Sequence, residues 1–268
     1  MEKKKILYVS QEICPYMNES AMGTLSSALP QLMQESGKDI RIFLPRFGTV
    51  NERRHQLHEV IRLSGMNLII DDFDHQLIIK VASIQQQRMQ VYFIDNEEYF
   101  KRKAVFTDDN NKQFKDNDER SLFFCRGVLE AVKKLGWAPD IIHCHGWMAS
   151  LLPVYIKEFY NDDPIFSDSK IVYSVYGNSF KGSLNNELKE KLSFDGICEE
   201  TVDSLAKPDF VNLNKAAISF SDGVVKADNK IAKELESYLE KQHVPILDHQ
   251  DSEEFSEKYE EFYSEIVA

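Results

Sequence analysis

The sequence predicts an α/β protein in which a mostly parallel sheet is flanked by helices and carries an inserted β-meander. Three observations support this fold class. Short apolar runs typical of buried strands recur along the 268 residues, helical stripes lie between several of them, and residues 57–95 are rich in β-branched and aromatic side chains. With 43% hydrophobic residues, the chain can bury a sizeable core.

The first predicted unit is a strand, a helix and a second strand. Residues 5–10 and 39–45 have the composition of buried strands, and residues 24–36 carry a helical stripe that Gly37 ends. Pro30 lies inside this stripe, so either a kink or a later helix start is expected. A helix between two strands with short links is a βαβ unit.

The middle of the chain changes pattern. Residues 57–95 predict a meander of short strands, inserted after the first βαβ unit. Residues 96–117 are polar and charged, which favours a long surface loop. Residues 118–135 predict a strongly amphipathic helix, which Gly136 ends.

Residues 140–153 are the stretch most suggestive of a site. Ile141 and Ile142 predict a buried strand, and two histidines and a tryptophan follow where that strand is expected to end, namely His143, His145 and Trp147. A helix is expected over residues 148–159. In open α/β sheets, ligands bind at the carboxyl ends of the strands, so these polar side chains are the candidate site.

The remaining residues predict two more strands and three helices. The strands lie at 171–176 and 222–226, and the helices at 211–220, 229–241 and 251–267. The last helix is rich in glutamate and carries an aromatic stripe, as an amphipathic helix docked on the rest of the chain would.

Composition and charge exclude several classes of function. A net charge of −12 and a pI near 5.1 disfavour nucleic-acid and membrane-surface partners, because both require clustered cationic surface. The four cysteines are widely spaced and predict free thiols in a reducing compartment. Neither a signal peptide nor an apolar run of bilayer length is evident, so a soluble, cytoplasmic protein is expected.

The pair His143 and His145 resembles a metal site only superficially. We expect the two side chains to point to opposite faces of the strand, and no spaced cysteines or histidines supply further ligands, so no metal is predicted. One histidine aimed into a cleft, with Trp147 packed beneath it, is the functional interpretation. The alternative is that both histidines only satisfy a strand-to-helix turn.

Common cofactor and nucleophile motifs are missing from the sequence. Residues 20–23, between the first strand and helix, contain neither a Gly-x-Gly-x-x-Gly pattern nor a Walker lysine. A Rossmann dehydrogenase is therefore not expected, and no cofactor is predicted. The Gly-x-Ser-x-Gly elbow of serine hydrolases is absent too.

Several segments in order resemble one enzyme family. They are Ile6-Leu-Tyr-Val-Ser-Gln-Glu, Ile40-Arg-Ile-Phe-Leu-Pro-Arg-Phe-Gly, Pro139-Asp-Ile-Ile-His-Cys-His-Gly-Trp and Asn212-Leu-Asn-Lys-Ala-Ala-Ile-Ser-Phe-Ser-Asp. Together they resemble bacterial glycogen synthases and plant starch synthases, the ADP-glucose-type glucosyltransferases of glycosyltransferase family 5. The resemblance covers residues 5 to about 235, which is the family's N-terminal catalytic domain only.

This resemblance implies an architecture. Family members have two Rossmann-like domains that face each other across a cleft, called GT-B. Residues 1–247 are then expected to form the acceptor-side, N-terminal domain, and residues 248–268 a C-terminal amphipathic helix docked on it. The second GT-B domain is expected to be absent.

The resemblance also implies a site. It makes His145 the catalytic candidate and Trp147, Tyr176, Asn18 and Gly23 the substrate-binding candidates. The implied partners are α-glucan, ADP-glucose or UDP-glucose, and a protein that supplies a donor domain.

Departures from the family pattern leave two hypotheses open. The phosphate-contacting Lys-x-Gly-Gly-Leu-Gly-Asp loop is Asn18-Glu-Ser-Ala-Met-Gly-Thr here, and Gly146 replaces the aspartate after His145. The first hypothesis is a glucosyltransferase that is weak or inactive as an isolated chain. The second is a non-catalytic glucan-binding, scaffolding or regulatory paralogue in glycogen metabolism. An unrelated nucleotide-binding α/β protein is a third, lesser alternative.

Overall fold

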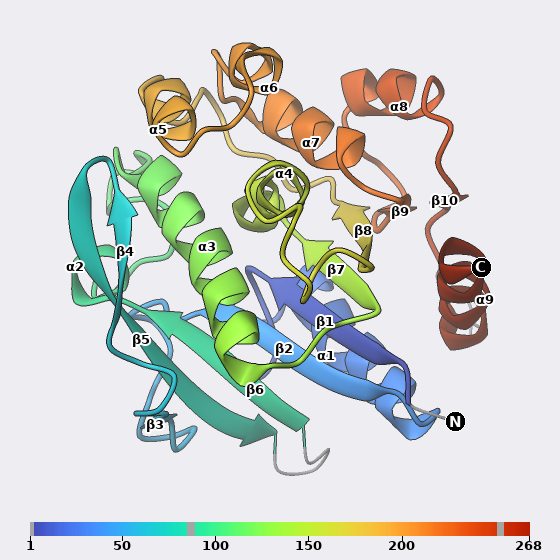
Figure 1. Cartoon of the computed structure of the whole chain (residues 1–268), viewed down its shortest axis with the longest axis horizontal. Coiled ribbons are helices and arrows are strands. Elements are labelled where there is room, and N and C mark those ends of the chain that lie inside the picture. Colours follow the sequence, from blue (N-terminus) through green and yellow to red (C-terminus); the bar gives the residue numbers. More distant parts are fainter. Residues whose placement is uncertain (1–2, 85–88, 251–254) are drawn as a thin grey trace.

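The computed structural model describes residues 3–84, 89–250 and 255–268 (Figure 1). One large sheet runs through the described residues in the order β10-β9-β8-β7-β1-β2-β6-β5-β3, and β4 pairs with β5 beside it. Neighbouring strands from β10 to β6 are all parallel, whereas β5 runs antiparallel to β6, β3 and β4. The predicted α/β class, a mostly parallel sheet with an inserted meander, is confirmed.

The parallel strands are short and apolar, as the sequence indicated. They are β1 (Lys5–Ser10), β2 (Asp39–Pro45), β6 (Met89–Asp95), β7 (Ile141–His145), β8 (Lys170–Val175), β9 (Gly223–Lys226) and β10 (Ile246–Leu247). The bounds predicted for the first two strands agree with the structure. Strand β7 continues through both histidines instead of stopping before them, because each of its residues pairs with both β1 and β8.

The meander consists of β3 (His58–Glu59), β4 (Met66–Ile70) and β5 (Phe73–Ile84). It leads into β6, which lies parallel beside β2 and so belongs to the main sheet. The loop predicted over residues 96–117 contains one short helix, α2 (Glu97–Phe100), whose first turn is capped by Asn96.

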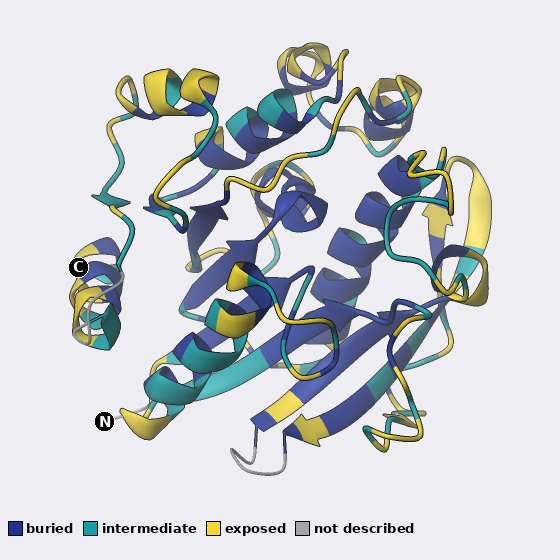
Figure 2. Cartoon of the chain, turned by 180° about the vertical axis from the view of Figure 1, so that it is seen from behind, coloured by how far each residue is buried: buried dark blue, intermediate teal, exposed yellow. Residues whose placement is uncertain are grey.

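Two layers of helices cover the sheet. Helices α3 (Asn117–Leu135), α4 (Leu151–Glu158) and α7 (Phe210–Ser219) pack in a row on one face, whereas α1 (Ala21–Glu35) lies behind the sheet (Figure 1). The buried strands and the inner sides of the helices form the core (Figure 2).

Helix α9 (Phe255–Val267) shares the face of α1. Side chains alternate along a strand, so alternate residues contact the helices on opposite faces of the sheet. Tyr173 of β8 bonds Asn214 of α7, whereas Tyr8 of β1 and His143 of β7 bond Tyr263 of α9.

Four shorter helices complete the description. They are η1 (Trp147–Ala149), α5 (Leu188–Phe194), α6 (Glu199–Ser204) and α8 (Lys233–Leu239). Helices α5 and α6 were not predicted, and α8 begins four residues later than expected. Helix α1 begins three residues earlier than expected, because the Ser20 hydroxyl caps it by accepting a hydrogen bond from the Gly23 amide at 2.9 Å. Pro30 remains inside that helix.

Candidate functional site

A groove of about 1070 Å³ lies where β1, β7 and β8 end. Gln11 and Glu12 follow β1, Trp147 follows β7, and two loops, 106–115 and 178–187, supply the rest of the lining. The Gln113 side chain donates a hydrogen bond to the Lys181 carbonyl at 3.4 Å, which links the two loops. The carboxyl edge of the parallel strands is thus a concave surface, as the topology of an open α/β sheet favours. We call it the Trp147 groove.

Trp147 forms the apolar floor of this groove. Its ring lies 4.8 Å from that of Phe106 and 5.1 Å from that of Phe180, so one aromatic side chain from each loop packs on it. Trp147 itself is only 5% exposed. The groove also presents polar side chains of both charges and neutral amides, namely Glu12, Asn111, Lys112, Lys115, Asn178, Lys181, Asn185 and Glu187. Apolar rings surrounded by hydrogen-bonding groups suit a polar ligand with apolar faces.

His143 and His145 point to the same face of β7, and the expectation that they point to opposite faces is wrong. Side chains alternate along a strand, so residues two apart share a face. The two ring centroids are 4.1 Å apart. His143 is bonded on both nitrogens, to the Tyr263 hydroxyl at 2.7 Å and to the Ser174 hydroxyl at 2.7 Å.

His145 is completely buried and does not line the Trp147 groove. Its Nδ1 lies 2.8 Å from the Tyr176 hydroxyl, and its Nε2 has no hydrogen-bond partner among the described residues. Burial lowers the pKa of His145 to about 3, so the ring is neutral near pH 7. A neutral imidazole with one unbonded nitrogen can exchange a proton with a group that reaches it.

Gly146 adopts a left-handed backbone conformation, with φ of 87°, and contacts Gln11. A Cβ atom at this position would lie 2.5 Å from the Gln11 carboxamide carbon. That carboxamide accepts a hydrogen bond from the Met148 amide at 3.1 Å and donates one to Glu12 at 3.3 Å. The space beside Gly146 is therefore occupied by Gln11, a residue that the sequence did not single out.

The other predicted site residues lie in different places. Tyr176 is buried against His145. Asn18 is exposed in the loop before α1, and Gly23 is buried in the first turn of that helix; neither lines the groove. The loop nevertheless contacts the groove through Ser20, whose hydroxyl donates a hydrogen bond to the Glu12 carboxylate at 2.6 Å.

Metal-ligand clusters and membrane-spanning helices are both absent from the described residues. Within residues 3–84, 89–250 and 255–268, no group of three or more histidine, cysteine, aspartate or glutamate side chains could hold a metal ion. Among the helices that the structure describes, none is both long enough and apolar enough to cross a membrane.

Comparison with known proteins gives consistent matches. A family model described as starch synthase catalytic domain matches residues 5–246. A glycogen synthase of Chlorobium limicola is 42% identical over 189 residues, covering 70% of this chain and 39% of the relative. A glycogen synthase of Chlorobium phaeovibrioides is 35% identical over 232 residues, covering 86% of this chain and 47% of the relative. This chain thus spans less than half the length of these curated relatives.

A solved structure matches the fold. It is the catalytic domain of starch synthase IV from Arabidopsis thaliana bound to ADP and acarbose, with a TM-score of 0.73 and 19% identity. The match covers 92% of this chain and 51% of the starch synthase chain.

Proposed function

Because the chain belongs to the starch synthase catalytic domain family, we propose that it binds α-1,4-glucan in the Trp147 groove and transfers little or no glucose on its own. The observation that carries this proposal is the groove itself. It is built at the carboxyl ends of β1, β7 and β8, and the tryptophan that follows His145 in the family pattern forms its floor.

The chemistry of the groove supports a glucan ligand. Glucose units have apolar faces that pack on aromatic rings and hydroxyls that pair with amides and charged groups. Phe106, Trp147 and Phe180 supply the rings, and Asn178 and Asn185 supply amides. The volume of about 1070 Å³ admits several sugar units.

Weak or absent catalysis follows from two departures from the family pattern, at Gly146 and Asn18. Gly146 provides no carboxylate, and Asn18 provides no positive charge for a diphosphate. Charged donors to phosphate are the strong ones, and losing a single stabilising donor costs a catalytic site about 10²–10³ in rate. Both changes act on the same reaction, so little turnover is expected from this chain alone.

Glucosyl transfer from ADP-glucose or UDP-glucose, completed by a protein that supplies a donor domain, is the second candidate. The observation that favours it is the His145 Nε2, which has no hydrogen-bond partner within the described ranges, because a buried nitrogen without a partner is costly unless a ligand uses it. The four cysteines, all free, fit work in a reducing compartment such as the cytoplasm.

Titration of maltoheptaose into the purified chain tests the binding proposal. We expect Phe180→Ala to weaken binding by about tenfold, because it removes one ring that packs on Trp147. Phe194→Ala is the matched control, since Phe194 is exposed on α5 and does not line the groove. Equal loss in both variants, or no binding by the unaltered chain, contradicts the proposal.

Incorporation of radiolabelled glucose from ADP-glucose or UDP-glucose into glycogen tests the second candidate. If the purified chain shows turnover that disappears in His145→Ala, the protein is a transferase, and the proposal that it transfers little or no glucose on its own is wrong. Glucan binding without turnover, with either donor, supports a binding role.

A further inference from the structure

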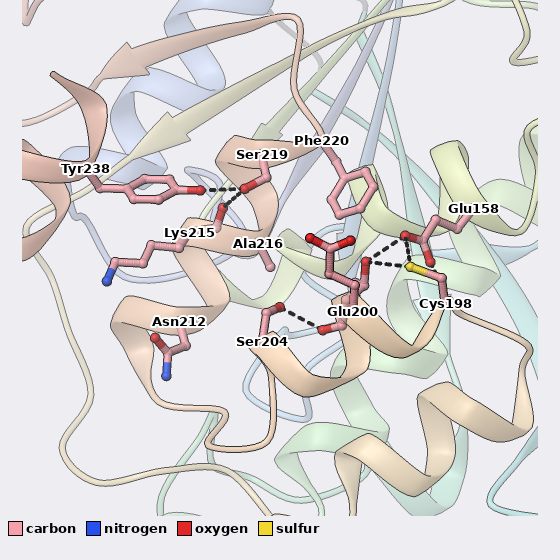
Figure 3. A pocket seen from close by; sticks show the side chains of 11 residues that line it. Glu158, Cys198, Glu200, Ser204, Asn212, Lys215, Ala216, Ser219, Phe220 and Tyr238 are labelled. Carbon is pink, nitrogen blue, oxygen red and sulfur yellow. Dashed lines mark hydrogen bonds between the residues drawn. The ribbon is translucent and has the colours of Figure 1, made fainter. Parts of the chain in front are cut away.

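A second concave surface lies on the outer side of α7, separate from the Trp147 groove. It begins with a pocket of about 440 Å³ between α6 and α7, which we call the α6–α7 pocket (Figure 3). None of its lining residues lines the Trp147 groove. Whatever binds here therefore does not compete directly with a ligand in the groove.

Internal hydrogen bonds make this pocket well defined. Glu158, at the end of α4, accepts hydrogen bonds from the Cys198 amide at 2.8 Å and from the Thr201 hydroxyl at 2.6 Å. These bonds hold the start of α6 against α4 and use the Glu158 carboxylate. Figure 3 shows the Cys198 thiol bonded to the same carboxylate. Across the pocket, the Ser219 hydroxyl lies 2.6 Å from the Tyr238 hydroxyl, which fixes the Tyr238 ring beside α7.

A depression of similar volume, about 440 Å³, adjoins the α6–α7 pocket and shares two residues with it, Lys215 and Tyr238. We call it the lysine depression. Its other lining residues are Lys233, Glu234, Ser237 and Lys241. Three lysines and one glutamate therefore line this depression, and the Lys215 ammonium lies 5.6 Å from the centre of the Tyr238 ring.

The cations of the lysine depression have no carboxylate partner among the described residues. Across the described part of the chain, lysines commonly pair with carboxylates, yet Lys215, Lys233 and Lys241 form no ion pair there. The chain has 44 acidic and 32 basic residues, so carboxylates are abundant. Three neighbouring cations without a partner produce a local positive potential on an acidic protein, which attracts an anion.

We propose that the two hollows form one binding site for a small phosphorylated molecule. Its phosphate lies among Lys215, Lys233 and Lys241, because lysine ammonium groups bind phosphate as point charges. Its uncharged part fills the α6–α7 pocket, which offers polar groups such as Asn212 and the apolar edge of Phe220.

Charge determines the orientation of this ligand. Glu200 lines the α6–α7 pocket and repels an anion there, whereas the lysine depression has an excess of cations. Size determines the class of ligand. Hollows of this volume suit small molecules rather than a folded partner, and a net charge of −12 disfavours nucleic acid.

Titration of the whole chain with inorganic phosphate, followed by amide NMR shifts, tests the phosphate half of the site. We expect saturable shifts on α7 and α8, and at least about tenfold weaker binding in K215Q/K233Q/K241Q. The matched control is K101Q/K189Q/K207Q, which removes the same charge from exposed lysines outside both hollows. Shifts spread over lysines of the whole surface, or an equal loss in the control, mean an adventitious ion only and overturn the proposal.

Comparison of glucose 1-phosphate with inorganic phosphate tests the other half. If the α6–α7 pocket holds the organic part, glucose 1-phosphate binds at least about tenfold tighter, and Asn212→Ala removes that advantage while leaving phosphate affinity unchanged. Equal affinities overturn the assignment of this pocket. Tighter binding of a polyglutamate peptide than of either phosphate overturns the small-molecule assignment. None of these results depends on glucan binding, so the outcome is distinguishable from that of the Trp147 groove.

Discussion

At the residue scale, Gly146 and Gln11 form a coupled pair. Gly146 combines a left-handed backbone with the close approach of the Gln11 side chain, and that side chain bonds the Met148 amide. Restoring an aspartate at position 146, as the family pattern has it, therefore requires more than one substitution.

We expect Gly146→Asp to lower the free energy of unfolding by about 2–4 kcal/mol, because it adds backbone strain to overpacking against Gln11. The double variant Gln11→Ala/Gly146→Asp, in which the Gln11 side chain is shortened, is expected to recover at least about 1 kcal/mol of the lost free energy of unfolding. Urea denaturation of the three proteins measures the coupling.

Gly196→Asp is the matched control for backbone strain. Gly196 has a similar φ of 82°, and nothing lies within 4 Å of a Cβ built there. Gly196→Asp is expected to lower the free energy of unfolding by only about 1–2 kcal/mol. If Gly146→Asp costs no more than this control, or if shortening Gln11 recovers nothing, the two residues are not coupled.

For His143 and His145, the sequence predicted part of the strand but not the hydrogen-bond partners. A buried strand at Ile141 and Ile142 was predicted from the apolar pattern, but its continuation through His143 and His145 was not. The partners of these histidines could not be predicted, because Tyr263 is 120 residues from His143 along the chain. No local pattern encodes such a contact.

At the element scale, α9 completes the core beside α1. Four side chains on one side of the helix are buried, namely Tyr259, Phe262, Tyr263 and Ile266. Gly223 of β9 allows this approach, because a Cβ there would lie 2.4 Å from the Ile266 Cδ1 atom. The buried side of α9 thus lies against β1, β7 and β9.

We expect Tyr263→Phe to lower the free energy of unfolding by about 1–3 kcal/mol. The Tyr263 hydroxyl lies 2.7 Å from His143 and 3.1 Å from the Tyr8 hydroxyl, and its removal leaves both buried groups without that bond. Thermal or urea unfolding of the variant measures the loss.

Tyr16→Phe provides the matched control for removing a buried tyrosine hydroxyl. The Tyr16 hydroxyl is buried and has no hydrogen-bond partner among the described residues, so its loss is expected to be neutral or stabilising. Equal effects of the two substitutions would mean that α9 gains nothing from the Tyr263 bonds.

Elements were predicted best where hydrophobic period and length agreed. Strands β1 and β2 match their predicted bounds, and α3 differs by one residue at its start. Helices α5 and α6 are only 7 and 6 residues long, and residues 177–210 carry too short a pattern to separate helix from loop.

At the scale of the whole molecule, acid stability depends on the buried histidine pair. Burial lowers the pKa of His143 well below its ordinary value and that of His145 to about 3. Histidines in the unfolded chain titrate near pH 6.5, so below that pH the unfolded state binds more protons than the native state. The contribution of the two histidines to the free energy of unfolding is therefore fully present above about pH 6.5, and it is lost as the pH drops toward 3.

His145 is expected to add about 1.4 kcal/mol per pH unit to the loss between pH 6 and 4, and the lowered pKa of His143 acts in the same direction. Burial of Asp118 acts in the opposite direction, because it raises the pKa of that carboxyl to about 6. The variant is therefore compared with the unaltered chain, so that the effect of Asp118 cancels. The slope of the unfolding free energy against pH should be smaller in His145→Gln by the equivalent of about one proton.

The exposed His243 gives the control, and His243→Gln should retain the slope of the unaltered chain. Identical slopes in all three proteins would show that His145 is not buried as a neutral ring. Urea unfolding at several pH values between 4 and 7 supplies the data.

The sequence by itself determined the α/β class, the order of the longer strands and helices and the family, because these depend on local periodicity and on motifs that are contiguous in the chain. Tertiary structure alone decided what the candidate residues contact. It buried His145 under Tyr176, placed Gln11 beside Gly146 and assembled the Trp147 groove from loops more than 60 residues apart. The physical reason is that packing and hydrogen bonding depend on distance in space, which sequence separation does not specify.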